Sequence, residues 1–168
     1  MHQSINLERF YPHSIDQIWF ALTNQSALTK WLMENDFEPT PGHQFQFLIK
    51  SELGETSIIY CEVLTVDPPI QLSYTWREQW MDQPSVVTWT LESVEDGTQL
   101  QLCHSGLDTA STQPVISPVE IWRSQTCQNT VTIAQTTVGM AAFSMDFRQE
   151  WQYRLNQMAE YLLPATTV

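Results

Sequence analysis

The stretch that decides the fold is residues 86–106, VVTWTLESVEDGTQLQLCHSG. Apolar side chains occupy every second position on both sides of Glu95-Asp96-Gly97, and this period of two is typical of half-buried strands. The Asp-Gly pair is a signal for the tight turn of a hairpin. The side chains expected on the buried face are Val87, Trp89, Leu91, Leu100, Leu102 and His104. His104 is the only ionisable group in this set, which makes it either a chemical group or part of a wall.

Two short helices are predicted directly after an opening strand. Residues 4–11 alternate between the two faces of a strand. Ser14 is followed three positions later by Gln17, which is a capping-box pattern, so we expect a helix to start at residue 15. Asn24 is placed to cap a second helix over residues 25–32.

Three further strands are predicted between these helices and the hairpin. Each is rich in β-branched or aromatic residues, or alternates strictly, and each is bounded by turn signals. The stretches are residues 44–50, 57–66 and 70–76. Asp67-Pro68-Pro69 connects the last two, and two consecutive prolines exclude a helix there.

A long amphipathic helix is predicted near the end of the chain. Its apolar side chains recur at steps of four, four, four, three and four residues, which places them on one helix face. They are Phe143, Phe147, Trp151, Leu155, Met158 and Leu162. The natural partner for so broad a face is the apolar inner face of an antiparallel sheet.

These elements predict an α+β fold in which a curved antiparallel sheet of six or seven strands wraps around the long C-terminal helix. A chain of 168 residues can bury one core without staples, so we expect residues 1–168 to form a single domain. Between residues 108 and 139 the pattern weakens, although Ser117-Pro118-Val119-Glu120 would suit the start of a helix.

The composition argues against several classes of partner. Seven Lys and Arg against nineteen Asp and Glu give a formal charge of −12, which repels phosphate backbones and anionic membranes. We therefore expect neither nucleic acid nor a membrane as partner. The start of the chain has no signal-peptide pattern and no window is long and apolar enough to span a bilayer, so we expect a cytoplasmic protein.

Strong metal and catalytic motifs are missing from the sequence. Cys61, Cys103 and Cys127 are odd in number and far apart, which favours reduced structural thiols over a metal site. There is no phosphate-binding Gly loop, no His-Glu-x-x-His and no Gly-x-Ser-x-Gly. We therefore predict no metal, no cofactor and no catalytic residue.

A short acidic run is the remaining candidate for acid–base or metal chemistry. Glu34, Asp36 and Glu38 stand at alternate positions. Two carboxylates can share such work, but the same spacing suits the solvated edge of a sheet. We favour the edge.

Seven short motifs carry a resemblance to a known family. They are Ile18-Trp19, Ala27-Leu28-Thr29-Lys30-Trp31-Leu32, Pro41-Gly42, Asp67-Pro68-Pro69, Leu72-Ser73-Tyr74-Thr75-Trp76, Val87-Thr88-Trp89 and Gly97-Thr98. In this order they closely resemble the SRPBCC superfamily, and within it proteins like the C-terminal domain of the activator of the heat-shock-protein-90 ATPase. The resemblance runs from Ser4 to Gly106 and resumes near Trp151, at what looks like the family's closing helix.

The resemblance implies a helix-grip fold with a deep, mostly apolar cavity between sheet and last helix. It does not imply one activity, because such folds host carriers, cyclases, sensors and chaperone cofactors. The chain departs from the family in two places. Glu150 stands where relatives usually carry Gly, and residues 109–144 form an atypically long insertion before the C-terminal helix.

The predicted ligand-binding residues are the bulky side chains that should face inward from the sheet and from the helix. They are Phe45, Phe47, Tyr74, Trp76, Trp89, Leu102, His104, Phe147, Trp151 and Leu155. Native packing leaves few voids, so these side chains either line a cavity or fill it completely. For His104 we favour a core or pocket-wall role over catalysis, because the sequence shows no partner that would orient the ring.

Three functions follow, in order of preference. The first is a protein that encloses a small apolar molecule, with Tyr74 and His104 making the orienting polar contacts. The second is a co-chaperone-like domain that binds a chaperone or another protein, although this chain lacks the N-terminal domain that such co-chaperones carry. The third is an enzyme that uses the same cavity, with His104 as general base and a tyrosine as proton donor. The sequence leaves open whether the protein is a monomer or a homodimer.

Overall fold

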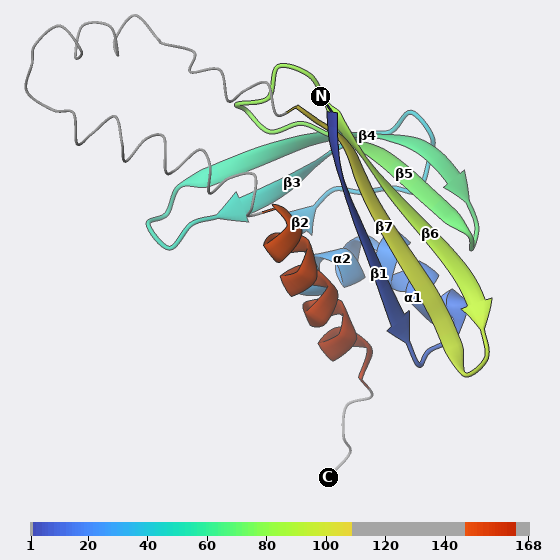
Figure 1. The fold of residues 1–168 in the computed structure, drawn as a ribbon. Coiled ribbons are helices and arrows are strands. Elements are labelled where there is room, and N and C mark those ends of the chain that lie inside the picture. The colour runs from blue at the N-terminus through green and yellow to red at the C-terminus, as the bar shows by residue number, and fades with distance from the viewer. Residues whose placement is uncertain (1, 109–146, 164–168) are drawn as a thin grey trace, which may run out of the picture.

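The computed structural model describes residues 2–108 and 147–163 and consists of one curved sheet with three helices on its concave side (Figure 1). The elements are β1 (His2–Tyr11), α1 (Ile15–Thr23), α2 (Gln25–Trp31), β2 (Glu34–Asn35), β3 (Gln44–Lys50), β4 (Thr56–Asp67), β5 (Gln71–Trp76), β6 (Ser85–Val94), β7 (Gly97–Asp108) and the C-terminal helix, residues 147–162. The predicted α+β fold and the predicted order of elements are confirmed.

The sheet has seven strands in the order β1-β7-β6-β5-β4-β3-β2, and every neighbouring pair is antiparallel. β7 and β6 lie second and third from the β1 edge, and they pair without interruption from Val94 opposite Gly97 to Val86 opposite Ser105. β1 then pairs with β7, so the first strand lies beside the last of the strands that the structure describes. Among the strands of residues 2–108, the sheet is open, because β1 and β2 each have one edge without a partner strand there.

In the β6–β7 hairpin, the side chains that the alternation predicts to face inward are buried. Its six inward side chains are between 0% and 2% exposed: Val87, Trp89, Leu91, Leu100, Leu102 and His104. The turn is the predicted one, with Asp96 at a φ of 67°. Gly97 is required by close packing, because a Cβ at this position would lie 2.2 Å from the carbonyl oxygen of Tyr11.

Side-chain caps set the two short helices. Ser14 Oγ accepts from the N–H of Gln17 at 3.3 Å, and the Gln17 side chain accepts from the N–H of Ser14 at 3.1 Å, which is the predicted capping box. Asn24 ends α1 and begins α2, since its side chain accepts from the N–H of Ala27 at 3.0 Å. The short link turns α2 so that Leu28 and Trp31 are buried.

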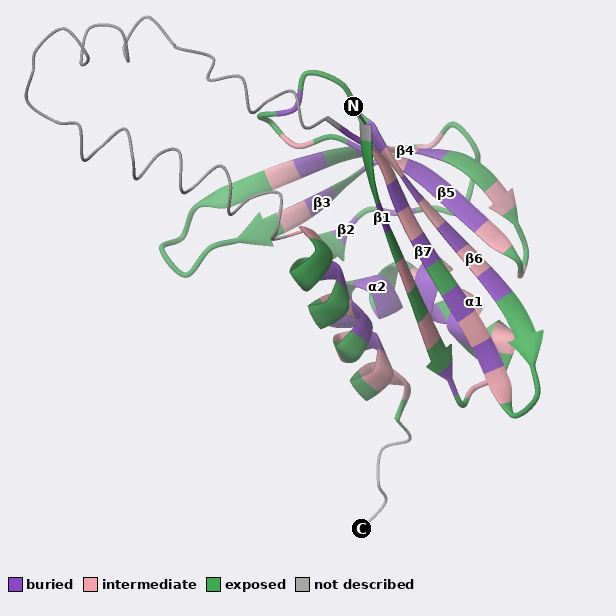
Figure 2. Ribbon diagram, viewed as in Figure 1, coloured by how far each residue is buried: buried purple, intermediate pink, exposed green. Residues whose placement is uncertain are grey.

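The C-terminal helix packs its predicted face onto the sheet. Trp151, Leu155 and Met158 are buried, Phe147 and Leu162 are half-buried, and the opposite face is exposed (Figure 2). Phe143 lies outside the described residues, as do the segment 109–144, the proposed helix start at 117–120, and Cys127.

The acidic run lies at the β2 edge of the sheet. Glu34 pairs with Lys50 at 2.6 Å across β2 and β3, and an oxygen of Asp36 accepts from the N–H of Gln46 at 2.7 Å. Both carboxylates are therefore engaged in holding the short edge strand β2 to its neighbour.

Within residues 2–108 and 147–163, no helix is long and apolar enough to cross a membrane.

Candidate functional site

The ten predicted site residues come together between the inner face of the sheet and the C-terminal helix. Phe45 and Phe47 come from β3, Tyr74 and Trp76 from β5, Trp89 from β6, Leu102 and His104 from β7, and Phe147, Trp151 and Leu155 from the helix. Nine are at most 4% exposed, and Phe147 is half-buried. Because alternate residues of each strand point to the same face, four strands deliver aromatic rings to one place.

Trp151 is the centre of this aromatic cluster. Its ring lies 5.3 Å from that of Trp76, 5.5 Å from that of Trp89 and 5.9 Å from that of His104, measured between centroids. The pairs are tilted or edge-to-face, which are the favourable arrangements of aromatic rings. One helix residue therefore contacts three neighbouring strands.

A second set of rings adjoins the first on β3 and β5. Phe45 lies 5.2 Å from Phe47 and 5.4 Å from Tyr74, and Phe37 lies 5.0 Å from Phe45, all edge-to-face. Phe47 also lies 5.7 Å from Trp76, so the two sets are continuous. The interior is thus lined by aromatic side chains whose rings contact one another.

A chain of three hydrogen bonds runs through the cluster and fixes the tautomer of His104. The indole N–H of Trp151 can only donate, and it reaches Nδ1 of His104 at 3.0 Å. Nδ1 is therefore the unprotonated nitrogen, and Nε2 donates its hydrogen to Oγ of Ser85 at 2.7 Å. Ser85 in turn donates to the carbonyl oxygen of Trp76 at 3.0 Å. Each polar side-chain atom in this series of hydrogen bonds has a partner.

This arrangement holds His104 neutral. Burial without a nearby anion lowers the pKa of His104 from 6.5 to about 4. A proton on Nδ1 would also face the indole N–H, donor against donor. His104 is therefore a buried residue whose two ring nitrogens both have hydrogen-bond partners.

The pairing with Ser85 does not activate a nucleophile. A general base must accept the serine hydrogen, but here the ring donates to Ser85 and the serine hydrogen goes to the backbone. Neither ring nitrogen has a free lone pair in this conformation. The geometry therefore gives no support to His104 as the general base of an enzyme.

Tyr74 and Trp89 form the other polar contact inside the cluster. The indole N–H of Trp89 donates to the Tyr74 hydroxyl oxygen at 3.0 Å. Burial raises the pKa of Tyr74 well above its usual range, so the hydroxyl stays protonated. Among residues 2–108 and 147–163, no acceptor takes up that hydroxyl hydrogen.

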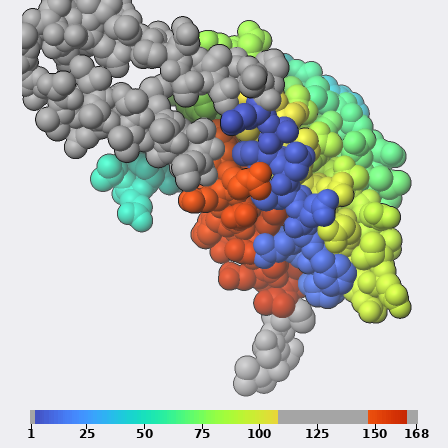
Figure 3. Space-filling view, in the orientation of Figure 1, coloured from blue at the N-terminus to red at the C-terminus, as the bar shows by residue number. Residues whose placement is uncertain are grey.

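Polar contacts along one side tie the C-terminal helix to the rest of the fold. The Tyr11 hydroxyl donates to the carbonyl of Leu155 at 2.8 Å, and Nε2 of His13 donates to that of Leu162 at 2.9 Å. Further contacts join Arg9 to Asn156 and Arg154 to the carbonyl of Leu32. In Figure 3 the helix lies directly against β1 on the face shown. Glu150, which departs from the family pattern, forms an ion pair with Arg154 at 2.7 Å.

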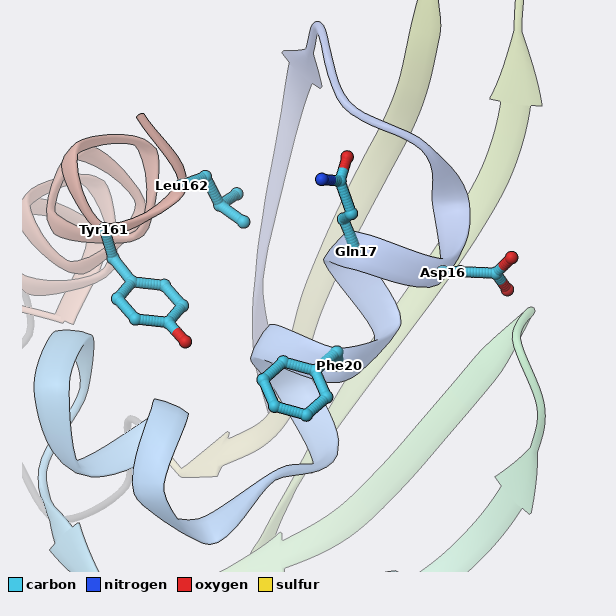
Figure 4. A pocket seen from close by; sticks show the side chains of 5 residues that line it. All are labelled: Asp16, Gln17, Phe20, Tyr161 and Leu162. Carbon is cyan, nitrogen blue, oxygen red and sulfur yellow. The ribbon is translucent and has the colours of Figure 1, made fainter. Parts of the chain in front are cut away.

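A shallow groove of about 400 Å³ lies outside the aromatic cluster, between α1 and the end of the C-terminal helix. Phe20 of α1 faces Tyr161 and Leu162 of the helix, and Asp16 points away from them (Figure 4). Phe20 is 53% exposed. This groove shares no residue with the predicted site.

Sequence reasoning missed two residues of the site, Ser85 and Phe37. Ser85 lies two positions before Val87 and four before Trp89, so extending the alternation of β6 backwards would have placed it inward. Phe37 lies within the acidic run, between Asp36 and Glu38, and is 2% exposed; the run was interpreted through its carboxylates, and its apolar side chain was not considered.

Comparison with known proteins gives one family and a set of structures. The model of the family "Activator of Hsp90 ATPase homolog 1-like protein" matches residues 12–163. No curated protein matches the chain. Protein MLL2253 from Mesorhizobium loti is 27% identical, with a TM-score of 0.67 over 99% of this chain and 100% of that one. Protein BH1534 from Bacillus halodurans is 24% identical, with a TM-score of 0.66 over 95% of this chain and 96% of that one.

A further similar structure is that of a protein from a biosynthetic locus. DynU16, described as a protein in the dynemicin biosynthetic locus, is 19% identical, with a TM-score of 0.61. The match covers 95% of this chain and 46% of that one. At this identity the likeness extends to the fold alone.

Proposed function

Because the chain belongs to the family of activator of Hsp90 ATPase homolog 1-like proteins, within the SRPBCC fold, we propose that it binds a small, largely apolar molecule between the sheet and the C-terminal helix. Residues 1–168 act in this proposal as one domain. The cytoplasm is the proposed compartment, which the unpaired thiols of Cys61 and Cys103 favour.

The observation that carries the proposal is the composition of the aromatic cluster around Trp151. Sites for small apolar molecules are walled by hydrophobic and aromatic side chains with a few placed polar atoms. Here the wall combines aromatic rings from four strands and one helix with two polar contacts, at His104 and at Tyr74. A core that served stability alone would gain little from buried polar atoms, since each is costly without a partner.

Because the rings around Trp151 already contact one another, we propose that a ligand takes the place of a side chain. The rings on β3, β5 and β6 are fixed by strand ladders on both sides. Trp151 stands on a helix that is attached through side chains. We therefore propose that Trp151 is the side chain that yields. The cost of moving it lowers the apparent affinity, and burial at about 25 cal/mol per Å² of apolar area opposes that cost.

Thermal unfolding with a library of apolar molecules tests the proposal. A molecule that binds only the folded protein raises its Tm. The variant Trp151→Ala starts less stable but has the space already open, so it should bind the same molecules more tightly than the wild type. Phe20→Ser, in the outer groove, is the matched control and should leave their affinity unchanged. Tm values that no molecule raises in either wild type or Trp151→Ala would refute the proposal.

The groove between α1 and the C-terminal helix favours a second candidate, a protein-binding role. A half-exposed Phe20 beside Tyr161 and Leu162 could receive an apolar side chain of a partner. By analogy with the family description, the partner would be a chaperone ATPase. Retention of such a chaperone by the wild type and its loss in Phe20→Ser, with ligand binding unaffected, would support this candidate over the first.

A further inference from the structure

We propose that the ligand of the aromatic cluster is a neutral, flat aromatic molecule with one N–H or O–H donor, and that this donor pairs with Nδ1 of His104 in place of the Trp151 indole. The inference rests on the proposed function and specifies the class of ligand. It treats Trp151 as the group whose shape and hydrogen bond the ligand reproduces.

The acceptor character of Nδ1 is set from the far side of the ring. The carbonyl of Trp76 takes the hydrogen of Ser85, which leaves Ser85 Oγ as an acceptor for Nε2–H of His104. A neutral imidazole carries one hydrogen, so Nδ1 must present a lone pair. These bonds do not involve the C-terminal helix, and they persist when Trp151 moves away.

Loss of the Trp151 contact would leave that lone pair buried. His104 is 0% exposed, and its ring is covered by Trp76 at 5.7 Å and Phe147 at 5.3 Å. A buried acceptor without a donor is costly, so a ligand that brings a donor avoids a penalty that a plain hydrocarbon incurs. This preference selects among apolar molecules of the same size.

The rings around Trp151 define the shape of the ligand. Trp76 and Trp89 lie 5.3 Å and 5.5 Å from the Trp151 ring, at interplanar angles of 58° and 85°. The space that an indole vacates between them therefore suits a flat fused ring. Bulky saturated groups do not fit this space, because the neighbouring rings would have to leave their packed positions to admit them.

Charge limits the ligand to neutral molecules. Within residues 2–108 and 147–163, the ring contacts and hydrogen bonds of Trp151 and His104 involve aromatic rings and the hydroxyl of Ser85, with no Lys or Arg among them. A carboxylate or phosphate buried there would have no counter-ion, and the chain as a whole carries a charge of −12.

Indole and benzofuran form the test pair, because they share size and shape but only indole has a donor. Binding of each is measured calorimetrically to the wild type, to Trp151→Ala, and to His104→Phe with and without Trp151→Ala. Indole should bind wild type and Trp151→Ala at least about tenfold more tightly than benzofuran. His104→Phe should remove this preference. Circular dichroism checks that each variant is folded, and the comparison in the wild type needs no variant.

The outcomes separate this inference from the proposed function. Equal binding of indole and benzofuran, or a preference that survives in folded His104→Phe, overturns the inference and leaves an apolar site. If Phe20→Ser abolishes binding of these molecules, they bind in the outer groove, and the inference is overturned as well. If neither molecule binds while donor-free apolar molecules raise the Tm, the inference is wrong and the proposed function stands. If nothing in the library binds, both fail.

Discussion

His104 is neutral because its hydrogen-bond partners and its burial act in the same direction. Trp151 offers a donor to Nδ1, Ser85 offers an acceptor to Nε2, and the ring has no contact with water. A second proton would break the contact with Trp151 and place a charge among aromatic rings. The same residue therefore links protonation, packing of the C-terminal helix and the shape of the proposed site.

Stability should depend on pH through this ring. Because the pKa of His104 is about 4 in the folded protein and 6.5 as the ordinary value, the unfolded chain takes up a proton between these pH values and the folded protein does not. The free energy of unfolding should therefore fall as the pH drops from about 6.5 to 4, by on the order of 3 kcal/mol. Urea unfolding at pH 7.5, 5.5 and 4.5 measures this.

His104→Gln is the control, because a glutamine can accept and donate in the same places but does not titrate. The difference in unfolding free energy between wild type and His104→Gln should shrink toward low pH. A difference that stays constant over this range would contradict the assignment of a neutral, buried ring.

Tyr74→Phe tests the other polar contact. The change removes the acceptor of the Trp89 indole N–H and leaves that donor buried, so the free energy of unfolding should fall by about 1–3 kcal/mol. Chemical denaturation measures the loss. The double change with Trp89→Phe should cost less than the sum of the single changes, and strict additivity would show that the two residues are not coupled.

The β6–β7 hairpin and the C-terminal helix meet at the hydrogen bond between His104 and Trp151, and β3 and β5 supply further rings of the site. The hairpin was predictable from residues 86–106 because alternation and an Asp-Gly turn are local signals, and burial of its inward face confirms them. The helix face was predictable from its step of three and four residues. The contact of Trp151 with His104 was not, because it joins residues 47 positions apart and depends on how helix and sheet meet.

Gly97→Ala should destabilise the hairpin. The added Cβ would meet the carbonyl oxygen of Tyr11 at 2.2 Å and the ring of Phe10 at 2.8 Å, so β1 and β7 would have to separate. We expect a loss of about 1–3 kcal/mol in thermal or urea unfolding. Glu95→Ala, an exposed neighbour in the same turn, should have little effect, and equal effects would speak against the close packing of Gly97.

Trp151→Ala should cost about 3–5 kcal/mol of unfolding free energy, because it empties the centre of the aromatic cluster. Tyr153→Ala is the matched control on the same helix. Tyr153 is 54% exposed, and its truncation should change stability by less than about 0.5 kcal/mol. A loss below about 1 kcal/mol for Trp151→Ala would show that the helix is not held on the sheet as described.

At the scale of the whole molecule, the sequence predicted the architecture more fully than the site. The order of elements, both helix caps and the inward residues follow from local patterns, and the family motifs agree with them. The ten bulky residues of the site come from elements far apart in the chain. Whether they line a space or fill it depends on how their side chains pack against one another. Alternation places Phe47 and Trp76 on the inner face but cannot give the 5.7 Å between their rings.

The proposed preference for neutral apolar molecules agrees with two features of the molecule. The chain carries a charge of −12, and the aromatic cluster contains two polar contacts, at His104 and at Tyr74. The central claim is that a ligand enters this cluster by displacing Trp151.

The most direct test of that claim is the indole N–H signal of Trp151 in a ¹H–¹⁵N spectrum, assigned through Trp151→Phe and followed during titration with a molecule that raises the Tm. If the ligand displaces Trp151, this signal shifts and loses its protection from exchange, because the hydrogen bond to His104 is released. A ligand that binds while the Trp151 signal stays unchanged and protected would contradict it.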